Sequence, residues 1–174
     1  MKWALAVLLG APIAASGAIA YSQFKHPAGD YSLEYPAHWK TFPGLQALGL
    51  RPPGKRGADV RVTFELYPIG RKSPQTSAAF IDDLLKAAKG LKKLESRKTL
   101  TVAGKPAQRL ALTETVALPG EYGQTLPGPI REIYLVIDLK EEYYVLKLAG
   151  LGEAFETARP EFERIAESLK FKPR

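Results

Sequence analysis

Apolar and polar residues alternate along several stretches of this chain, and such alternation is typical of strands with one buried face. The alternation is cleanest where Val60, Val62 and Phe64 are interleaved with polar residues. Proline and glycine mark the ends of these stretches, because neither residue continues a strand ladder easily. The predicted strands are residues 31–35, 45–50, 59–67, 98–102, 107–116, 130–139 and 143–148. Residues 21–29 are predicted to be a short lead-in.

Two stretches change to helical spacing, in which apolar residues recur three or four positions apart. The first is predicted to begin at Ser73, which can cap a helix, with Pro74 in the first turn. Its predicted apolar stripe is Phe80, Leu84, Ala87 and Leu91. The second stretch covers residues 153–169, where Pro160 is expected to divide a short turn from the main helix.

The order of these elements indicates an antiparallel sheet. Strands come first, a helix follows, and four strands then form two hairpins before the C-terminal helix. The hairpin turns are predicted at residues 103–105 and 140–142. Residues 118–129 are rich in proline and glycine and are predicted to be a long loop between the hairpins. The predicted fold class is therefore α+β, an antiparallel sheet with helices packed on it.

The N-terminal residues have the composition of a secretion signal. Lys2 precedes a mostly apolar run, and residues 18–20 form a small-x-small cleavage pattern. Proline and glycine interrupt the run, which counts against a membrane-spanning helix, although an uncleaved N-terminal anchor is the alternative. Residues 1–20 are thus predicted to be a signal peptide. Residues 21–174 are predicted to be one domain, exported to the periplasm or beyond the cell.

The chain has a formal net charge of +7 and a pI near 9.5. A basic exported protein meets anionic lipid, wall polymer and acidic proteins rather than nucleic acid. We therefore expect a protein or an anionic envelope surface as the partner, with peripheral membrane contact and no nucleic acid. The candidate contact residues on this basic surface are Lys55, Arg56, Lys89, Lys92 and Lys93. A solvated surface that only aids solubility is the alternative.

No catalytic pattern stands out in the sequence. The absence of cysteine and of a Gly-x-Ser-x-Gly motif excludes disulfides, a lipid-carrying cysteine and the commonest nucleophile patterns. The residues with metal-binding chemistry are His26, Asp30 and His38, and their spacing matches no compact ligand set. We therefore expect no enzyme activity, no metal site and no cofactor.

Two short motifs resemble one protein family. Residues 31–39, YSLEYPAHW, are similar to the opening motif of PsbP-like domains. Residues 159–165, RPEFERI, and 168–171, SLKF, are similar to the closing helix and final strand of that group. The resemblance implies the Mog1/PsbP-like α/β/α sandwich. The group includes photosystem accessory proteins, a nuclear transport factor and bacterial envelope proteins, so the resemblance also implies an accessory role, with no ligand residues carried over.

Charge, export and the missing catalytic pattern together predict an exported, non-catalytic accessory or binding domain. Its contacts are expected on the basic surface and at the tip of the predicted loop, where Glu121, Tyr122 and Gln124 lie. One alternative is a small-ligand or lipid carrier with a pocket between sheet and helix. An enzyme of unrecognised type is the third alternative.

Overall fold

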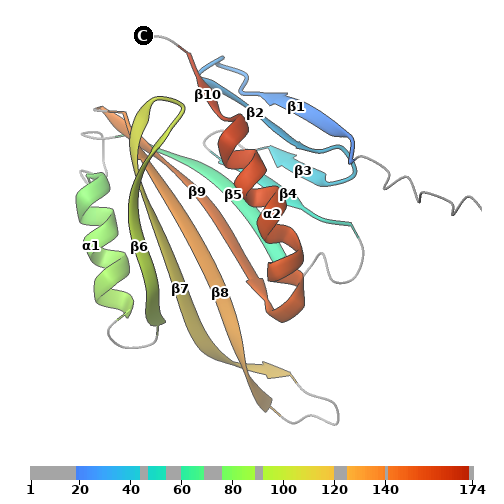
Figure 1. The fold of residues 1–174 in the computed structure, drawn as a ribbon, viewed down its shortest axis with the longest axis vertical. Helices are drawn as coiled ribbons and strands as arrows, with labels where there is room; N and C mark the ends of the chain where they lie inside the picture. Colours follow the sequence, from blue (N-terminus) through green and yellow to red (C-terminus); the bar gives the residue numbers. More distant parts are fainter. Residues whose placement is uncertain are drawn as a thin grey trace, which may run out of the picture.

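The computed structural model contains a seven-stranded antiparallel sheet, a helix on each of its faces and a separate three-stranded sheet (Figure 1). The structure describes residues 19–43, 47–53, 60–68, 76–88, 92–119, 125–139 and 141–172. The elements in chain order are β1 (Tyr21–Lys25), β2 (Tyr31–Pro36), β3 (Lys40–Pro43), β4 (Ala47–Arg51), β5 (Val60–Pro68), α1 (Ser77–Ala88), β6 (Lys92–Val102), β7 (Lys105–Pro119), β8 (Thr125–Asp138), β9 (Glu142–Leu151), α2 (Gly152–Ser168) and β10 (Lys170–Phe171). The predicted α+β class with an antiparallel sheet is confirmed.

The large sheet has the strand order β3-β4-β5-β9-β8-β7-β6. The turn between β6 and β7 consists of Ala103 and Gly104, which have φ values of 49° and 76°. Positive φ at both positions gives a tight two-residue hairpin turn, which glycine adopts without strain. The hairpin predicted at residues 103–105 is confirmed, and so is the second hairpin, formed by β8 and β9.

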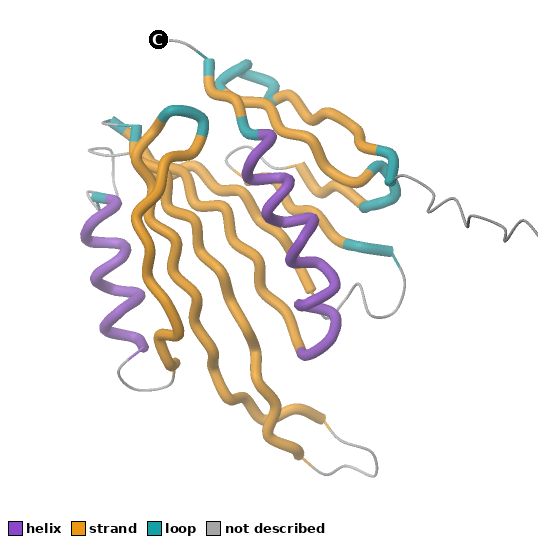
Figure 2. The backbone as a smooth tube through the Cα atoms, viewed as in Figure 1, coloured by secondary structure: helices purple, strands orange, loops and turns teal. Residues whose placement is uncertain are grey.

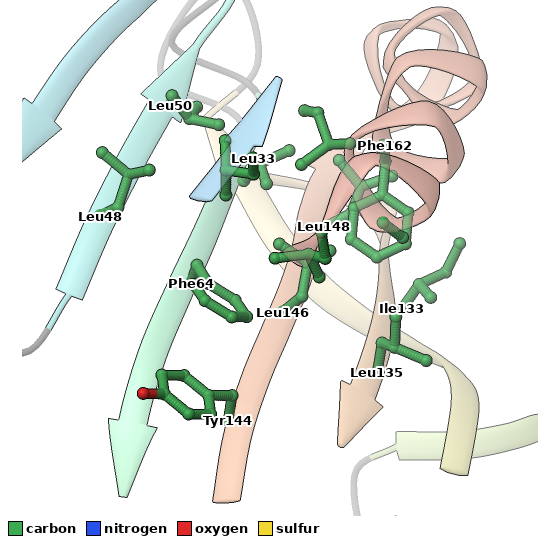
Figure 3. Close-up of a cluster of buried hydrophobic side chains, with 14 of the residues drawn as sticks. Leu33, Leu48, Leu50, Phe64, Ile133, Leu135, Tyr144, Leu146, Leu148 and Phe162 are labelled. Atoms are coloured by element: carbon green, nitrogen blue, oxygen red, sulfur yellow. The ribbon is translucent and has the colours of Figure 1, made fainter. Parts of the chain in front are cut away.

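The interior strand β8 is buried on both of its faces. Ile133 and Leu135 belong to the apolar cluster under α2, part of which is drawn in Figure 3. Tyr134 and Val136 belong to the cluster under α1. A strand that is apolar on both sides needs a cover on each side, which is why the two helices lie on opposite faces of the sheet.

The stripe of α1 that packs on the sheet differs from the predicted one. The residues of α1 in this cluster are Phe80, Ile81, Leu84, Leu85 and Ala88. Ile81 is buried although it was not in the predicted stripe, whereas Ala87 was in it and is exposed. Leu91 lies outside the described residues. Positions i, i+3, i+4 and i+7 counted from Ile81 face the sheet, so the true stripe is rotated slightly around the helix.

The start of α1 also differs from the prediction. The helix begins at Ser77, and Thr76 caps it because Thr76 Oγ1 accepts a hydrogen bond from the Ala79 N–H at 3.2 Å. The predicted start at residues 73–74 lies outside the described residues.

The three-stranded sheet, in the order β1-β2-β10, covers the large sheet beside α2 (Figure 2). Leu33 of β2 is only 1% exposed and lies within the large apolar cluster. Tyr31 meets Phe64 of β5 edge to face, with ring centroids 4.6 Å apart. The Glu34 N–H donates to Ser168 Oγ at the end of α2, at 2.8 Å. The small sheet and α2 therefore form one layer over the large sheet.

Two helices are too narrow to cover both faces of this sheet. Seven strands spaced about 4.8 Å apart span about 29 Å, whereas a helix with its side chains is about 10–12 Å wide. Helix α2 packs on β9, β8 and β5, and the small sheet extends that layer over the β5 side, so β6 and β7 are left open on this face. Helix α1 packs mainly on β6 and β8, so β3 and β4 are left open on the other face.

Three predictions about strands are wrong. Residues 21–25, predicted only to be part of a short lead-in, form β1 and pair with β2 along the whole strand. Strand β3 was not predicted, because four residues ending in proline give no clear alternation. The long loop predicted at residues 118–129 is mostly strand, since β7 continues to Pro119 and pairs there with Thr125, the first residue of β8.

The prolines in this last region are tolerated because the β7–β8 ribbon extends beyond its neighbours (Figure 1). Strand β6 pairs with β7 only as far as Glu114, and β9 pairs with β8 only from Ile130 onward. Each strand of the ribbon therefore has one free edge, where a residue without an N–H breaks no ladder. Composition alone does not reveal this exception.

Helix α2 is continuous, so the break predicted at Pro160 is wrong. The buried residues of α2 are Phe155, Ala158, Phe162, Ile165 and Ala166. Pro160 lies on the exposed side of the helix. Proline has no N–H to bond the Glu156 carbonyl, but burial of apolar residues before and after it holds the two turns in one helix.

We expect Pro160→Ala to raise the free energy of unfolding by about 1–3 kcal/mol, because alanine restores the missing helix hydrogen bond and removes the ring. Denaturant unfolding measures the change. Glu167→Ala, at another exposed position of α2, is the control and should change stability by less than about 0.5 kcal/mol. A less stable proline variant would contradict this interpretation of α2.

We expect Phe162→Ala to lower the free energy of unfolding by about 3–5 kcal/mol, because Phe162 is 0% exposed and its removal leaves a cavity under α2. Leu94→Ala is the control, since Leu94 is 38% exposed on edge strand β6. Similar losses for the two variants in the same unfolding measurement would show that α2 is not held by this core.

Candidate binding groove

A groove lies between α2 and the uncovered part of the large sheet. It comprises two cavities of about 440 Å³ and about 420 Å³, and Arg109 of β7 lines both of them. Figure 1 shows this side of the molecule, with α2 in front of the sheet and β6 and β7 beside it. The charged residues that line the first cavity are Glu95, Arg109, Arg131, Glu132, Glu156 and Arg159. The apolar residues that line the second are Leu100, Val102, Ala103, Leu135, Phe162 and Ala166.

Strand alternation places the arginines of the sheet in the groove. Arg131 precedes Ile133 and Leu135 by two and four residues, so its side chain lies on the same face of β8. Arg109 pairs with Leu135 across the β7–β8 ladder and shares that face. The apolar stripe of β8 therefore gives way to a charged residue beyond the part that α2 covers.

Helical spacing places the partners of these arginines on one side of α2. Glu156, Arg159 and Glu163 are three and four residues apart and therefore face the same direction. Each of them lines one of the two cavities. The groove thus has a charged rim on both the helix and the sheet.

Ion pairs connect the two rims. Arg109 Nη2 lies 2.7 Å from Glu163 Oε1. Arg131 Nη1 donates to Glu156 Oε1, and Arg159 Nη1 lies 3.3 Å from Glu156 Oε2. One carboxylate therefore serves two guanidinium groups, so some guanidinium N–H donors at this end of the groove remain for other acceptors.

These pairs are open to solvent and can exchange partners. The side chains of Arg131 and Glu156 are 43% and 40% exposed, and ion pairs at such exposure contribute about 0–1 kcal/mol. A carboxylate or phosphate from outside can bind the spare guanidinium donors in a bidentate geometry. The second cavity, which Arg109 also lines, offers apolar surface next to the charged first cavity. The groove therefore suits a partner that is both anionic and partly apolar.

Lys92, a predicted contact residue, lies instead in an ion cluster on the α1 side of the sheet. Glu132 is 5% exposed and is the buried charged residue of the described part of the chain. Lys92 Nζ lies 2.5 Å from Glu132 Oε2 and 3.3 Å from Glu114 Oε2. Lys147 Nζ lies 2.6 Å from Glu132 Oε1. Because this cluster joins β6, β7, β8 and β9, the Lys92 ammonium is already held by carboxylates of the domain.

The pKa directions agree with a structural role for this cluster. Burial raises the pKa of the Glu132 carboxyl, but hydrogen bonds from Lys147 and Lys92 and their charges outweigh it and hold the pKa below 4.5. Burial lowers the pKa of Lys92. Its carboxylate partners, Glu132 first, raise the pKa by more than burial lowers it, so the net pKa is above 10.5. Burial, followed by the charge of Glu132, raises the pKa of Tyr134. All three side chains therefore keep one charge state at neutral pH.

The other predicted contact residues have different outcomes. Lys93 is exposed and pairs with Glu95, with Nζ 3.1 Å from Oε1. Lys92 and Lys93 begin strand β6. The residues outside the described part of the chain are Lys55, Arg56, Lys89, Glu121, Tyr122 and Gln124. Their role in binding stays a prediction.

The structure does not bring His26, Asp30 and His38 together. His26 Nδ1 lies 3.1 Å from Asp30 Oδ2. His38 lies beyond the opposite end of the β1–β2 hairpin, and at about 3.4 Å per residue the two ends of these strands are about 15 Å apart. Across the described ranges, no group of three or more His, Cys, Asp or Glu side chains is placed to hold a metal ion.

The groove residues Arg109, Arg131 and Arg159 were not predicted from the sequence. Arg131 did carry a signal, because it continues the alternation of a strongly apolar strand at a position that should be buried. A charge at such a position indicates that the layer packed on this face of the sheet ends there. Arg109 carried the same signal on β7, but without knowledge of where α2 lies neither signal could be read as a site.

The comparisons with known proteins support the fold. No family model and no curated protein matches the sequence. The chain is similar to the solved structure of PsbP (CyanoP) from Synechocystis, with 14% identity, a TM-score of 0.60 and coverage of 94% of this chain and 99% of that one. It is similar to the Ran-binding protein Mog1p from Saccharomyces cerevisiae, with 10% identity, a TM-score of 0.59 and coverage of 88% and 96%.

A third similar structure is LpqN of Mycobacterium tuberculosis, described as involved in cell envelope biogenesis, with 16% identity, a TM-score of 0.57 and coverage of 90% and 92%. The chain has the Mog1/PsbP-like fold, as the two sequence motifs implied. At these identities the likeness shows the fold, and function has to be inferred from the site. Within the described residues, no helix has the length and apolar character needed to cross a membrane.

We expect Glu132→Gln to lower the free energy of unfolding at pH 7 by about 2–4 kcal/mol, because it leaves Lys92 and Lys147 without their buried counter-charge. Folding lowers the pKa of Glu132 below 4.5, so its contribution is complete above that pH and is lost as the pH falls through the folded-state pKa. The wild type should therefore lose stability below about pH 5 more steeply than the variant. Equal acid slopes in denaturant unfolding would contradict the assignment, and exposed Glu95→Gln is the control.

Proposed function

We propose that this chain is an exported, non-catalytic binding domain whose groove beside α2 takes an acidic segment of an envelope partner. The observation that carries the proposal is the arrangement of Arg131 and Arg159 around the single carboxylate of Glu156. The two guanidinium groups are half-exposed in an open groove, and planar guanidinium groups bind carboxylates in two-point geometry. The apolar second cavity favours a segment that also carries apolar side chains.

A non-catalytic role is supported by the chemistry of the groove lining. Its three arginines, Arg109, Arg131 and Arg159, are joined to glutamates in ion pairs. Guanidinium groups stay protonated and cannot act as general acids or bases. Such a lining recognises charge and shape, which is the chemistry of binding.

The descriptions of two similar structures support a binding role and an envelope location. Mog1p is named as a Ran-binding protein and LpqN as a protein of cell envelope biogenesis. Export is supported by the predicted signal peptide at residues 1–20. Under this proposal the partner lies outside the cytoplasm.

A carrier of an amphipathic anionic small molecule is the second candidate. It is favoured by the second cavity, where Leu100, Leu135 and Phe162 offer apolar surface next to the Arg109 guanidinium. A fatty acid or lipid would place its acidic group at the arginines and its chain along these residues. The two candidates differ in the size of what is bound.

Photo-crosslinking in the envelope of the producing cell tests the proposal. A photoreactive residue in place of Thr113, which lines the first cavity, is expected to give a discrete polypeptide product. The same residue in place of Thr99, which is exposed on the other face of β6, is the control. Adding Arg131→Glu and Arg159→Glu should reduce the Thr113 product at least about tenfold, because each charge-assisted contact contributes about 1.5–3 kcal/mol.

Two results would count against the acidic segment. Equal products from both positions, or a Thr113 product that survives the double arginine variant, would place the contact elsewhere. A mass gain of lipid size would select the carrier instead. Lys86→Glu with Arg97→Glu changes charge by the same amount on the α1 side of the sheet, away from the groove, and should leave the product unchanged.

A further inference from the structure

The face of the large sheet opposite the groove carries a second exposed surface, on strands β3, β4 and β5. Helix α1 packs mainly on β6 and β8 and leaves much of this area uncovered. Leu48, Leu50 and Val62 turn toward the core beneath the small sheet. The residues between them therefore point to the open side.

Three cations lie side by side on this open surface. Lys40 pairs with Arg51 in the β3–β4 ladder, and Arg51 lies beside Arg61 in the continuing β4–β5 register. Because neighbouring strands are about 4.8 Å apart, the three positions span about 10 Å. Lys40, Arg51 and Arg61 are called the cation row below.

The cation row has no counter-charge within the described part of the chain. All three side chains are exposed, and none forms an ion pair with a carboxylate of the described residues. Across the sheet, Arg61 pairs with Ala149 of β9, and Ala149 pairs with Glu132 of β8. Lys92 and Lys147 already hold the Glu132 carboxylate. Like charges opposite one another on neighbouring strands destabilise a sheet. An arrangement that weakens the free domain and has no counter-charge among the described residues indicates an external anion.

An exposed aromatic ring lies next to the cation row. Phe42 is 51% exposed, and the Arg51 guanidinium lies over its ring, 5.3 Å from the centroid. Phe42 pairs with Gly49, and a Cβ at Gly49 would lie 3.4 Å from Phe42 Cβ. Cations around an exposed aromatic residue are typical of surfaces that lie on membranes, because the ring enters the headgroup region while the charges meet phosphates.

The exposed ring together with the cations favours a bilayer over a soluble acidic partner. A bilayer surface offers phosphates to the cations and an apolar region beneath them to the ring.

We infer that the cation row and Phe42 dock this domain on the surface of an anionic bilayer. The groove lies on the other face of the sheet, so a docked domain presents the groove away from the lipid. This inference concerns a different surface from the groove and goes beyond the function proposed for it. Phosphate groups of lipid headgroups are the expected counter-charge of Lys40, Arg51 and Arg61.

Vesicle co-sedimentation of the protein purified from an envelope fraction tests the inference. The wild type is expected to bind vesicles of phosphatidylglycerol and phosphatidylcholine at low salt, and to bind vesicles of phosphatidylcholine alone far less. The triple variant Lys40→Gln, Arg51→Gln, Arg61→Gln should bind the anionic vesicles on the order of a hundredfold more weakly, since each cation near such a surface contributes about fivefold. Phe42→Ser should also weaken binding without changing the charge.

A matched triple variant separates the cation row from net charge. Lys93→Gln, Lys98→Gln and Lys105→Gln remove the same charge at the far edge of the sheet and should bind within about threefold of the wild type, because that edge lies beyond the screening length. Thermal unfolding gives a second measurement, since only the cation-row variant should melt at a higher temperature.

Several results would overturn the inference. They are no wild-type binding to the anionic vesicles, equal losses in the two triple variants, and a cation-row variant that binds as the wild type does. Binding of an acidic peptide without binding of vesicles would also overturn it. Arg131→Glu should leave vesicle binding intact, so the groove proposal and this one fail separately.

Discussion

The width of the large sheet, compared with the width of a helix, is the constraint on which the rest of this structure depends. Strand β8 is apolar on both faces, so the sheet needs a helix on each side. Seven strands span about 29 Å, whereas one helix covers about 10–12 Å. The small sheet β1-β2-β10 closes part of the difference on one face only. Each face therefore keeps an uncovered area, and the two areas lie at opposite edges of the sheet.

Charged residues mark both uncovered areas. On the α2 side, Arg131 interrupts the apolar stripe of β8 where the helix cover ends and meets Glu156 across the groove. On the α1 side, Arg51 and Arg61 occupy the open faces of β4 and β5. The difference between the two areas lies in pairing, because the groove arginines have carboxylate partners within the domain and the cation row has none among the described residues. A paired site can exchange partners with an acidic segment, whereas an unpaired row suits a continuous anionic surface.

Local pattern was enough to predict the fold but not the groove. Alternation around Val62 and Phe64, and the two motifs at residues 31–39 and 159–165, correctly indicated an antiparallel sheet of the Mog1/PsbP-like kind. Two of the wrong predictions, the break in α2 and the loop at residues 118–129, share one cause, since proline was read from local rules alone. In α2 and in the β7–β8 ribbon, burial of neighbours and free strand edges decide whether proline is tolerated, and both depend on tertiary contacts. The groove likewise depends on how much of the sheet α2 covers, and no local sequence pattern predicts this.

Native and denaturing mass spectrometry of the protein, purified gently from its envelope fraction, tests the central claim that the groove beside α2 is a binding site. Ala111 lines the first cavity, so Ala111→Trp should fill it without changing any charge. The expected result is extra mass on the wild type that is present only under native conditions and is absent from the tryptophan variant. Bare wild-type protein, or the same extra mass on a folded Ala111→Trp variant, would contradict the claim.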